Sequence, residues 1–175
     1  ILEHVTFTFV VEGMSLAARS QLFRHLLASY TEQSKRAVDA RDLGVVIPTS
    51  VLVNKVAEGL FLDLMDACYD TYESLVDLGV PREDARYVMP VATETSFVVT
   101  YNGRELFESV FPDRLCRRAQ WEVREVVGQM YRIAMSVMPS VFKLTGPRCK
   151  NGRCSEVEQC RTAVSAVVFT IPETR

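Results

Sequence analysis

The sequence predicts one compact domain of mixed α and β structure. Its 175 residues suit a single domain, and no internal repeat, low-complexity tract or linker divides them. Both kinds of pattern occur: β-branched and aromatic residues fill positions 5–11, residues 93–102 alternate, and two long segments have helical periodicity. No apolar run reaches the roughly 18 residues of a membrane-spanning helix.

A strand and a helix are expected at the beginning of the chain. The strand covers residues 5–11 and ends at Gly13, and Ser15 then occupies the position of a helix N-cap. The helix is expected to cover residues 16–30. Its core-facing positions are Ala18, Leu22 and Leu26, and its polar stripe consists of Gln21, Arg24 and His25. A polar segment follows as far as Pro48.

Two long amphipathic helices are predicted in the rest of the chain. The first covers residues 51–78, and Gly79 marks its end. A short helix at 82–89 and a strand at 93–102 precede the second, which is expected to begin near Asp113. The apolar face of the first consists of Leu60, Leu64, Cys68, Tyr72 and Leu75, and that of the second of Leu115, Ala119, Val123, Val126, Met130 and Ala134.

The charge composition excludes a polybasic surface but singles out arginine. The formal net charge is -2, and 16 of the 20 basic residues are Arg, whose planar guanidinium binds phosphate and carboxylate in a bidentate manner. Five arginines lie at predicted ends of elements, where phosphate-binding groups gather: Arg24, Arg36, Arg86, Arg104 and Arg114. Solvated surface arginines, in a chain whose genome prefers Arg to Lys, would give the same pattern.

The chain lacks the common catalytic and metal-binding motifs. It has no P-loop, dinucleotide fingerprint, zinc-protease motif or serine-nucleophile elbow. Histidine occurs only at positions 4 and 25, which excludes a multi-histidine metal site within one chain. Cys149, Cys154 and Cys160 lie in a loop-like tail that begins at Gly146 and leads to a predicted strand at 166–171. Their spacing favours reduced thiols, then a disulfide, then a metal site, and reduced thiols favour a cytoplasmic location.

From the segment that carries Arg24 onward, the sequence resembles the flavin-dependent thymidylate synthase family. The family signature is Arg-His-Arg, seven residues and Ser; the chain has Arg24, His25, Leu26, seven residues and Ser34. The resemblance continues, in the family's order, through GVPREDARYVMP, TYNGREL and DRLCRRAQWEVRE. It implies an α+β fold, with a mixed or antiparallel sheet packed against long helices in a single domain over residues 1–175.

The resemblance implies a flavoenzyme that methylates a uracil nucleotide monophosphate. Such an enzyme takes a methylene group from methylenetetrahydrofolate and reducing equivalents from NADPH through FAD, and it uses no protein nucleophile. The family is a homotetramer whose active sites form where subunits meet. Neither a nucleic acid nor a membrane is expected as a partner.

The resemblance also assigns roles to residues by their position. The implied nucleotide contacts are Gln21, Arg24, Glu32, Ser34, Arg36, Arg86 and Arg114. Arg114 is the implied catalytic residue, because a guanidinium beside uracil N3 stabilises the negative charge that develops there. The implied flavin contacts are Arg24, His25, Glu32, Asn102, Arg104 and Glu108. No metal ligand is implied.

The chain departs from the family's pattern in several places. Leu26 replaces the third signature residue, an arginine, and Ala37 stands where a tyrosine is common. The stretch between Glu108 and Arg114 is one residue longer than in some relatives. The family's N-terminal segment, which brings a His and a Ser or Thr to FAD, is expected to precede Ile1.

Three functions fit these observations. The first is methylation of dUMP or of a close relative. The second is the UMP methylation of nucleoside-antibiotic pathways, for which Leu26 and Ala37 are the clues, and Ala37 predicts that dUMP and UMP are both accepted. The third is a non-catalytic nucleotide- or RNA-binding relative. Joint retention of the nucleotide and flavin positions weighs against the third.

Overall fold

The computed structural model describes residues 1–34, 38, 43–152 and 154. The chain divides into two compact units. Unit 1 consists of Ile1–Phe9, His25–Ser29 and Thr100–Arg175, as far as these are described, and unit 2 of Val10–Arg24 and Tyr30–Val99, with the same restriction. The single domain expected from the sequence stays a prediction. Among the described residues, no helix has the length and apolar character needed to cross a bilayer.

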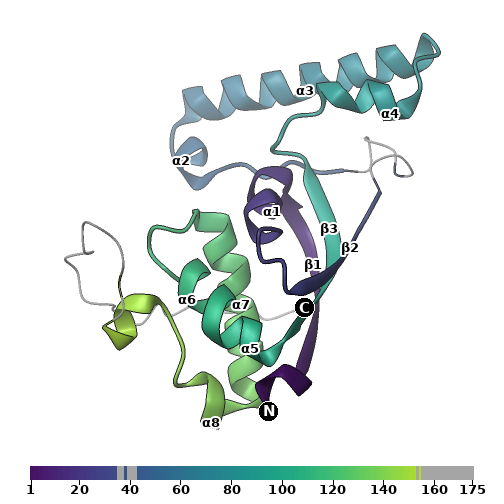
Figure 1. The fold of residues 1–175 in the computed structure, drawn as a ribbon. Helices are drawn as coiled ribbons and strands as arrows, with labels where there is room; N and C mark the ends of the chain where they lie inside the picture. The colour runs from purple at the N-terminus through teal and green to yellow at the C-terminus, as the bar shows by residue number, and fades with distance from the viewer. Residues whose placement is uncertain (35–37, 39–42, 153, 155–175) are drawn as a thin grey trace. The chain divides into compact units, whose positions relative to one another are not determined.

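Three strands form one antiparallel sheet in the order β1-β3-β2 (Figure 1). They are β1 (Thr6–Ser15), β2 (Ala28–Glu32) and β3 (Glu94–Asn102). Alternate residues of β1 and β3 are buried, as the alternation of the sequence predicts. The strands predicted at 5–11 and 93–102 are therefore confirmed, although β1 continues through Gly13, whose φ of +67° lies in the left-handed region that favours glycine. The α+β class is confirmed as well.

Helix α1 (Leu16–Leu22) begins at the predicted N-cap and buries the predicted side chains. The Ser15 hydroxyl oxygen accepts a hydrogen bond from the backbone N–H of Ala18 at 3.1 Å. Ala18 and Leu22 are fully buried. The beginning of the predicted helix is thus confirmed.

The predicted continuation of this helix to residue 30 is wrong. The Tyr30 hydroxyl donates to the Leu22 carbonyl at 3.0 Å, and the ring of Phe23 lies 4.1 Å from that of Tyr30. Pairing of β2 with β3 and these aromatic contacts outweigh the helical propensity of the segment. Leu26, expected to face the core, is 84% exposed, and His25, expected on a polar stripe, is buried.

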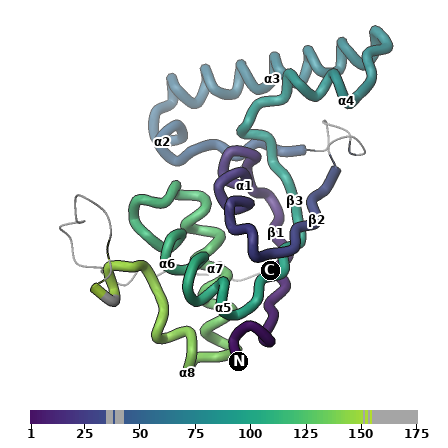
Figure 2. Tube along the Cα trace, viewed as in Figure 1, coloured from purple at the N-terminus to yellow at the C-terminus, as the bar shows by residue number. Residues whose placement is uncertain are grey.

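The predicted helix over 51–78 is divided into α2 (Thr49–Leu52) and α3 (Lys55–Asp77). The division occurs at Asn54, whose side-chain oxygen accepts hydrogen bonds from two backbone N–H groups of the first turn of α3, at 3.1 and 3.2 Å. After α3 the chain reverses, and the short helix α4 (Arg82–Ala85) lies beside the end of α3 (Figure 2). A single 3-10 turn (Arg86–Val88) follows α4.

The buried side of α3 matches the predicted face only in part. Tyr72 is buried and packs with Ala85 of α4, as the predicted face requires. Leu60 and Leu64, on the same predicted face, are 69% and 60% exposed among the described residues. Met65, which is not on the predicted face, is buried. Helical periodicity therefore predicted the buried side correctly at Tyr72 and wrongly at Leu60 and Leu64.

Unit 1 is built from short helical segments and one long helix. The elements are a 3-10 turn (Leu2–His4), α5 (Gly103–Glu105), a π-helical turn (Leu106–Val110), α6 (Phe111–Arg114), α7 (Trp121–Val137), α8 (Pro139–Phe142) and a 3-10 turn (Arg148–Asn151). The helix predicted from Asp113 is therefore interrupted, and it begins again where the Gln120 side-chain oxygen accepts from the Val123 N–H at 2.9 Å. The predicted strand at 166–171 lies outside the described residues.

Aromatic side chains and the apolar face of α7 form the core of unit 1. The ring of Phe142 meets those of Phe7 and Phe111 edge-on, at centroid distances of 5.5 and 5.6 Å. Three predicted residues of α7, Val123, Met130 and Ala134, are at most 2% exposed, whereas Val127 is fully buried in place of the predicted Val126, which is half-buried. This packing fixes α6, whose last residue is Arg114.

Candidate active site

One helical segment, residues 103–114, carries the predicted site residues of unit 1 that follow β3. Asn102 begins it, because its side-chain oxygen accepts a hydrogen bond from the Glu105 backbone N–H at 2.7 Å. Gly103 must be small at this point, since a Cβ there would lie 3.0 Å from the Leu2 carbonyl oxygen. The segment is thus fixed at its N-terminal end by a cap and by a close backbone contact.

The middle of the segment is a π-helical turn, Leu106–Val110. A π turn closes its hydrogen bonds over five residues rather than four, so it can take up an extra residue inside a helix. It overlaps the stretch between Glu108 and Arg114 that the resemblance predicts to be one residue longer than in some relatives. Such turns are frequent at functional sites, and this one ends next to α6 and Arg114.

Several polar side chains contact His25. We call His25, Glu105, Ser109 and Arg114 the His25 cluster, in which His25 and Glu105 are buried and Ser109 and Arg114 are half-buried. The Arg114 Nε–H donates to His25 Nε2 at 2.8 Å. On the other side of the ring, Nδ1 lies 3.0 Å from the Ser109 Oγ and 3.4 Å from the Glu105 Oε1. Burial, reinforced by the positive charge of Arg114, holds the pKa of His25 below its usual range. The cluster joins the predicted signature to the predicted catalytic residue.

A second polar group of unit 1 is exposed, and we call Arg104, Glu3 and Glu108 the Arg104 cluster. Arg104 donates from Nη1 to Glu3 at 2.6 Å and from Nε to Glu108 at 2.9 Å. All three side chains are more than half exposed. The hydrogen bond and charge of Arg104 lower the pKa of Glu3, and the two carboxylates raise the pKa of Arg104.

In unit 2, Glu32 at the end of β2 has both carboxylate oxygens engaged. The Thr95 hydroxyl donates to one oxygen at 2.9 Å, and the Arg19 guanidinium pairs with the other. Arg19 also lies over the ring of Phe23, with 4.4 Å between the guanidinium carbon and the ring centroid. A ligand that binds Glu32 must therefore share this carboxylate with Arg19 or Thr95.

The other predicted residues of unit 2 lie on or beside its elements. Gln21 is half-buried on α1, Arg24 is exposed just after that helix, and Ser34 is exposed just after β2. Arg36 and Ala37 lie outside the described residues. The structure thus shows two partial sets of site residues, one in each unit.

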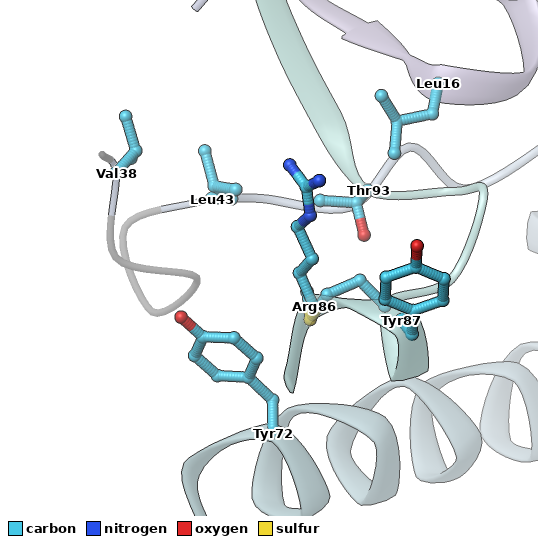
Figure 3. A pocket seen from close by; sticks show the side chains of 8 residues that line it. Leu16, Val38, Leu43, Tyr72, Arg86, Tyr87 and Thr93 are labelled. Atoms are coloured by element: carbon cyan, nitrogen blue, oxygen red, sulfur yellow. The ribbon is translucent and has the colours of Figure 1, made fainter. Parts of the chain in front are cut away.

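A cavity of about 260 Å³ in unit 2 contains the guanidinium of Arg86 (Figure 3). Its lining residues are Leu16, Val38, Leu43, Tyr72, Arg86, Tyr87, Met89 and Thr93, of which only Arg86 is charged. The Arg86 Nε donates to the Glu83 carbonyl at 3.0 Å. Typical small-molecule sites hold about 300–1,000 Å³. The cavity is therefore slightly smaller than a typical small-molecule site and offers a ligand one charged side chain, that of Arg86.

The donor chemistry of unit 1 fits the flavin dinucleotide that the resemblance implies. A dinucleotide carries a pyrophosphate, and Arg104, two residues after Asn102, presents an exposed guanidinium. Glu3 and Glu108 now share that guanidinium, so a bound pyrophosphate would compete with them. Over the described part of the chain, no three His, Cys, Asp or Glu side chains gather as metal ligands. Cys149 and Cys154 are not in disulfides, and Cys160 lies outside the described residues.

Sequence reasoning missed Glu105 and Ser109. A signal for Glu105 exists: Asn102 followed three residues later by Glu is a capping-box pattern, which predicts a helix beginning after Asn102. Only half of the box forms, since the Glu105 backbone N–H bonds to Asn102 while its carboxylate faces His25. No local pattern pointed to Ser109, because its partner is 84 residues away in the sequence.

Comparison with known proteins shows which family the chain resembles. A family described as "Thymidylate synthase complementing protein" matches residues 1–140. The chain is 48% identical over 158 residues to the flavin-dependent thymidylate synthase of Geobacter sulfurreducens, covering 89% of this chain and 68% of that protein.

Two archaeal proteins of the same name are also similar. The protein of Saccharolobus solfataricus is 43% identical over 151 residues, which covers 85% of this chain and 57% of that protein. The protein of Pyrococcus furiosus is 39% identical over 165 residues, with 89% and 67% covered. The chain thus spans about 57–68% of the length of these three curated relatives.

Proposed function

This chain belongs to the thymidylate synthase complementing protein family, that of the flavin-dependent thymidylate synthases, and we propose that it methylates C5 of dUMP. The family identified from the signature and the later sequence blocks is therefore confirmed. In the proposed reaction methylenetetrahydrofolate supplies the carbon, and reduced flavin supplies the hydride that completes the methyl group. We further propose that the flavin is FAD and that NADPH reduces it.

The observation that carries this proposal is the hydrogen bond between Arg114 and His25. The two residues come from separate blocks of the resemblance, and the fold of unit 1 brings their side chains within 2.8 Å. If Arg114 were only a solvated surface arginine, it would not be expected to donate a hydrogen bond to the buried side chain of His25.

Arg114 acts on the uracil ring in the proposed mechanism. Uracil N3 lies between two carbonyl groups, and a guanidinium beside it stabilises negative charge on N3 and on the neighbouring oxygens. An anionic ring has more electron density at C5, which makes C5 a better nucleophile toward the methylene carbon. Because Arg114 is half-buried and its partner His25 is buried, the guanidinium acts there with less screening than at the surface. No protein nucleophile is required.

The remaining arginines bind the nucleotide in this proposal. Arg36 and Arg86 hold the phosphate, and Arg86 brings the one charged side chain among the residues that line the cavity in unit 2. The other proposed nucleotide contacts are Gln21, Arg24, Glu32 and Ser34. FAD, when bound, supplies the reducing equivalents of the reaction, and its proposed contacts are Arg24, His25, Glu32, Asn102, Arg104 and Glu108.

We also propose a homotetramer with active sites formed between subunits. A row of exposed apolar side chains on α3 supports an assembly, because Val56, Leu60 and Leu64 are 60–74% exposed. Sedimentation under assay conditions should report a tetramer, and a fully active monomer would refute this part of the proposal. The four described cysteines are free, which is consistent with the reducing cytoplasm that we propose as its location.

Product analysis tests the proposed reaction. Protein supplied with FAD, NADPH, methylenetetrahydrofolate and dUMP should form dTMP, and omission of any one component should stop its formation. A non-catalytic relative would bind dUMP without forming dTMP. UMP and dUMP supplied together test the expectation from Ala37, because a pocket that tolerates the extra hydroxyl yields ribothymidylate as well.

A further inference from the structure

Glu105 is a buried carboxylate that none of the proposed nucleotide or flavin contacts includes. It is 8% exposed, and its Oε1 faces His25 Nδ1. Glutamate is rarely buried unless it is paired, because removing the charge from water is costly. A buried carboxylate at this position therefore needs a polar partner, and the side chain of His25 lies close enough to be one.

The contact between Arg114 and His25 fixes the protonation state of the imidazole. A guanidinium is a donor only, and its Nε–H points at His25 Nε2 from 2.8 Å. A proton on Nε2, in the imidazolium or in the other neutral tautomer, would place two N–H groups against each other. His25 must therefore be neutral, with its proton on Nδ1 and a lone pair on Nε2.

Two side chains lie near Nδ1 of His25, and only one of them requires the proton to be on Nδ1. Ser109 Oγ is the nearer, at 3.0 Å, but a hydroxyl can donate or accept and so tolerates either tautomer. A carboxylate can only accept, and Glu105 Oε1 lies 3.4 Å from Nδ1. A lone pair on Nδ1 would face that negative charge, whereas an N–H there is attracted to it. Glu105 thus selects the proton on Nδ1.

The charges around His25 balance in favour of the neutral ring. Burial and the charge of Arg114 lower the pKa of His25, whereas Glu105 and Asp113 raise it. The two lowering effects are the larger, so the pKa of His25 is below its usual range. Asp113 does not touch the ring and is bound instead by Arg148, at 2.7 Å. Neutral pH therefore leaves the ring uncharged and able to accept from Arg114.

We propose that Glu105 is a positioning residue, which holds His25 in the tautomer whose Nε2 accepts the Arg114 Nε–H and thereby orients the guanidinium for its ligand. With Nε committed to His25, an anionic ligand must be met by the terminal Nη groups of Arg114. The catalytic part of this inference rests on the proposed function, whereas the tautomer itself does not.

Histidine nitrogen NMR of the isotope-labelled protein tests the tautomer without any substrate. The chain has only His4 and His25, so His4→Gln assigns the spectrum. In the unsubstituted protein at neutral pH, His25 should show a protonated Nδ1 and an unprotonated Nε2. A charged ring or a proton on Nε2 would overturn the proposal.

Two variants separate Glu105 from its neighbour on the same helical segment. Glu105→Gln keeps the shape but removes the charge, and because its amide can donate to Nδ1, a population protonated at Nε2 should form. Ser109→Ala should keep the proton on Nδ1, and so should Asp113→Asn, which removes a nearby charge that does not contact the ring. The reverse result, a change in Ser109→Ala and none in Glu105→Gln, would overturn the proposal. Should Glu105→Gln fail to fold, Ser109→Ala still decides the question.

Kinetics give the second readout. Glu105→Gln should lower kcat by about 10- to 100-fold, the usual cost of removing a partner that orients a functional side chain, with a much smaller change in KM for dUMP. Equal changes in kcat and in affinity would assign Glu105 a merely structural role. If the unsubstituted protein forms no dTMP, the proposed function fails, and the NMR result still decides the tautomer.

Discussion

The His25 cluster and the Arg104 cluster lie along the same helical segment of unit 1, yet their surroundings differ. In the first, the side chains of His25 and Glu105 are 5% and 9% exposed. In the second, Arg104 and Glu3 are 56% and 60% exposed. The bond lengths are similar, since Arg114 lies 2.8 Å from its partner and Arg104 lies 2.6 and 2.9 Å from its two partners.

The hydrogen bonds of the two clusters are therefore similar in length but are expected to differ in their contribution to stability. An exposed ion pair gains little, because water and salt screen it and its flexible side chains lose entropy. A buried group cannot fall back on water, so the loss of one partner leaves the other unsatisfied. We expect the His25 cluster to hold Arg114 in one geometry and the Arg104 cluster to rearrange readily when a ligand binds.

The largest effect is expected at Arg114. Arg114→Ala should lower the single-turnover rate of flavin oxidation by about 100- to 1,000-fold, the range seen when a preorganised donor to a developing anion is removed. Arg114→Lys should also be slow, because an ammonium cannot bond to His25 through Nε and still present a planar pair of donors.

Nucleotide titration of the same variants is the control for binding. If Arg114 acts mainly on the developing anion, dUMP affinity should fall much less than the rate does. Equal losses of rate and affinity would reduce Arg114 to a binding residue and would weaken the contrast with Arg104.

An intermediate effect is expected from acid. His25 has a lowered pKa in the native protein, whereas in the unfolded chain it titrates near about 6.5. Below that pH the unfolded chain takes up a proton that the native protein does not. The free energy of unfolding should thus be highest above about 6.5 and fall as the pH drops toward the lowered native pKa, by at most about 1.4 kcal/mol per pH unit.

Urea unfolding at several pH values between about 7.5 and 5.5 measures this slope. His4→Gln should keep the dependence, because His4 is exposed and is not part of the buried cluster. His25→Gln should lose the part of the slope that His25 contributes. The same slope in His25→Gln as in the unsubstituted protein would show that the buried imidazole is not its source.

The smallest effect is expected at Glu3. Glu3→Gln removes one carboxylate from the Arg104 cluster, and since Glu3 is exposed, the Tm should stay the same within error. Any shift seen at low salt should vanish at high salt, because exposed charges are screened. A large, salt-independent loss of stability would contradict the difference drawn between the two clusters.

Local sequence signals predicted the elements of the fold better than their ends. The caps at Ser15 and the alternation of β3 gave correct elements, because neighbouring residues decide them. The helix predicted through residue 30 failed, since β2 pairs with a strand more than 60 residues away. Periodicity likewise placed Tyr72 on the buried side of α3, but it wrongly placed Leu60 and Leu64 there, because tertiary packing buries Met65 instead.

Site residues that belong to a family motif could be predicted from the sequence, whereas residues that join the site only through tertiary packing could not. His25 and Arg114 came from the family resemblance, and the structure brings them together. Glu105 escaped notice because a glutamate in a helical segment is usually solvated, and only the tertiary fold turns its carboxylate toward His25. A residue that orients a functional side chain without touching the ligand is placed by tertiary packing. Local sequence spacing does not show it.

One measurement tests the central claim, that this buried arginine site serves the methylation of dUMP. The flavin-loaded protein is reduced without oxygen and mixed with dUMP and methylenetetrahydrofolate, and flavin oxidation and dTMP are quantified in the same sample. We expect one dTMP for each flavin oxidised, and no dTMP when dUMP is omitted. Flavin oxidation at the same rate without dUMP, or oxidation that yields no dTMP, would contradict the account.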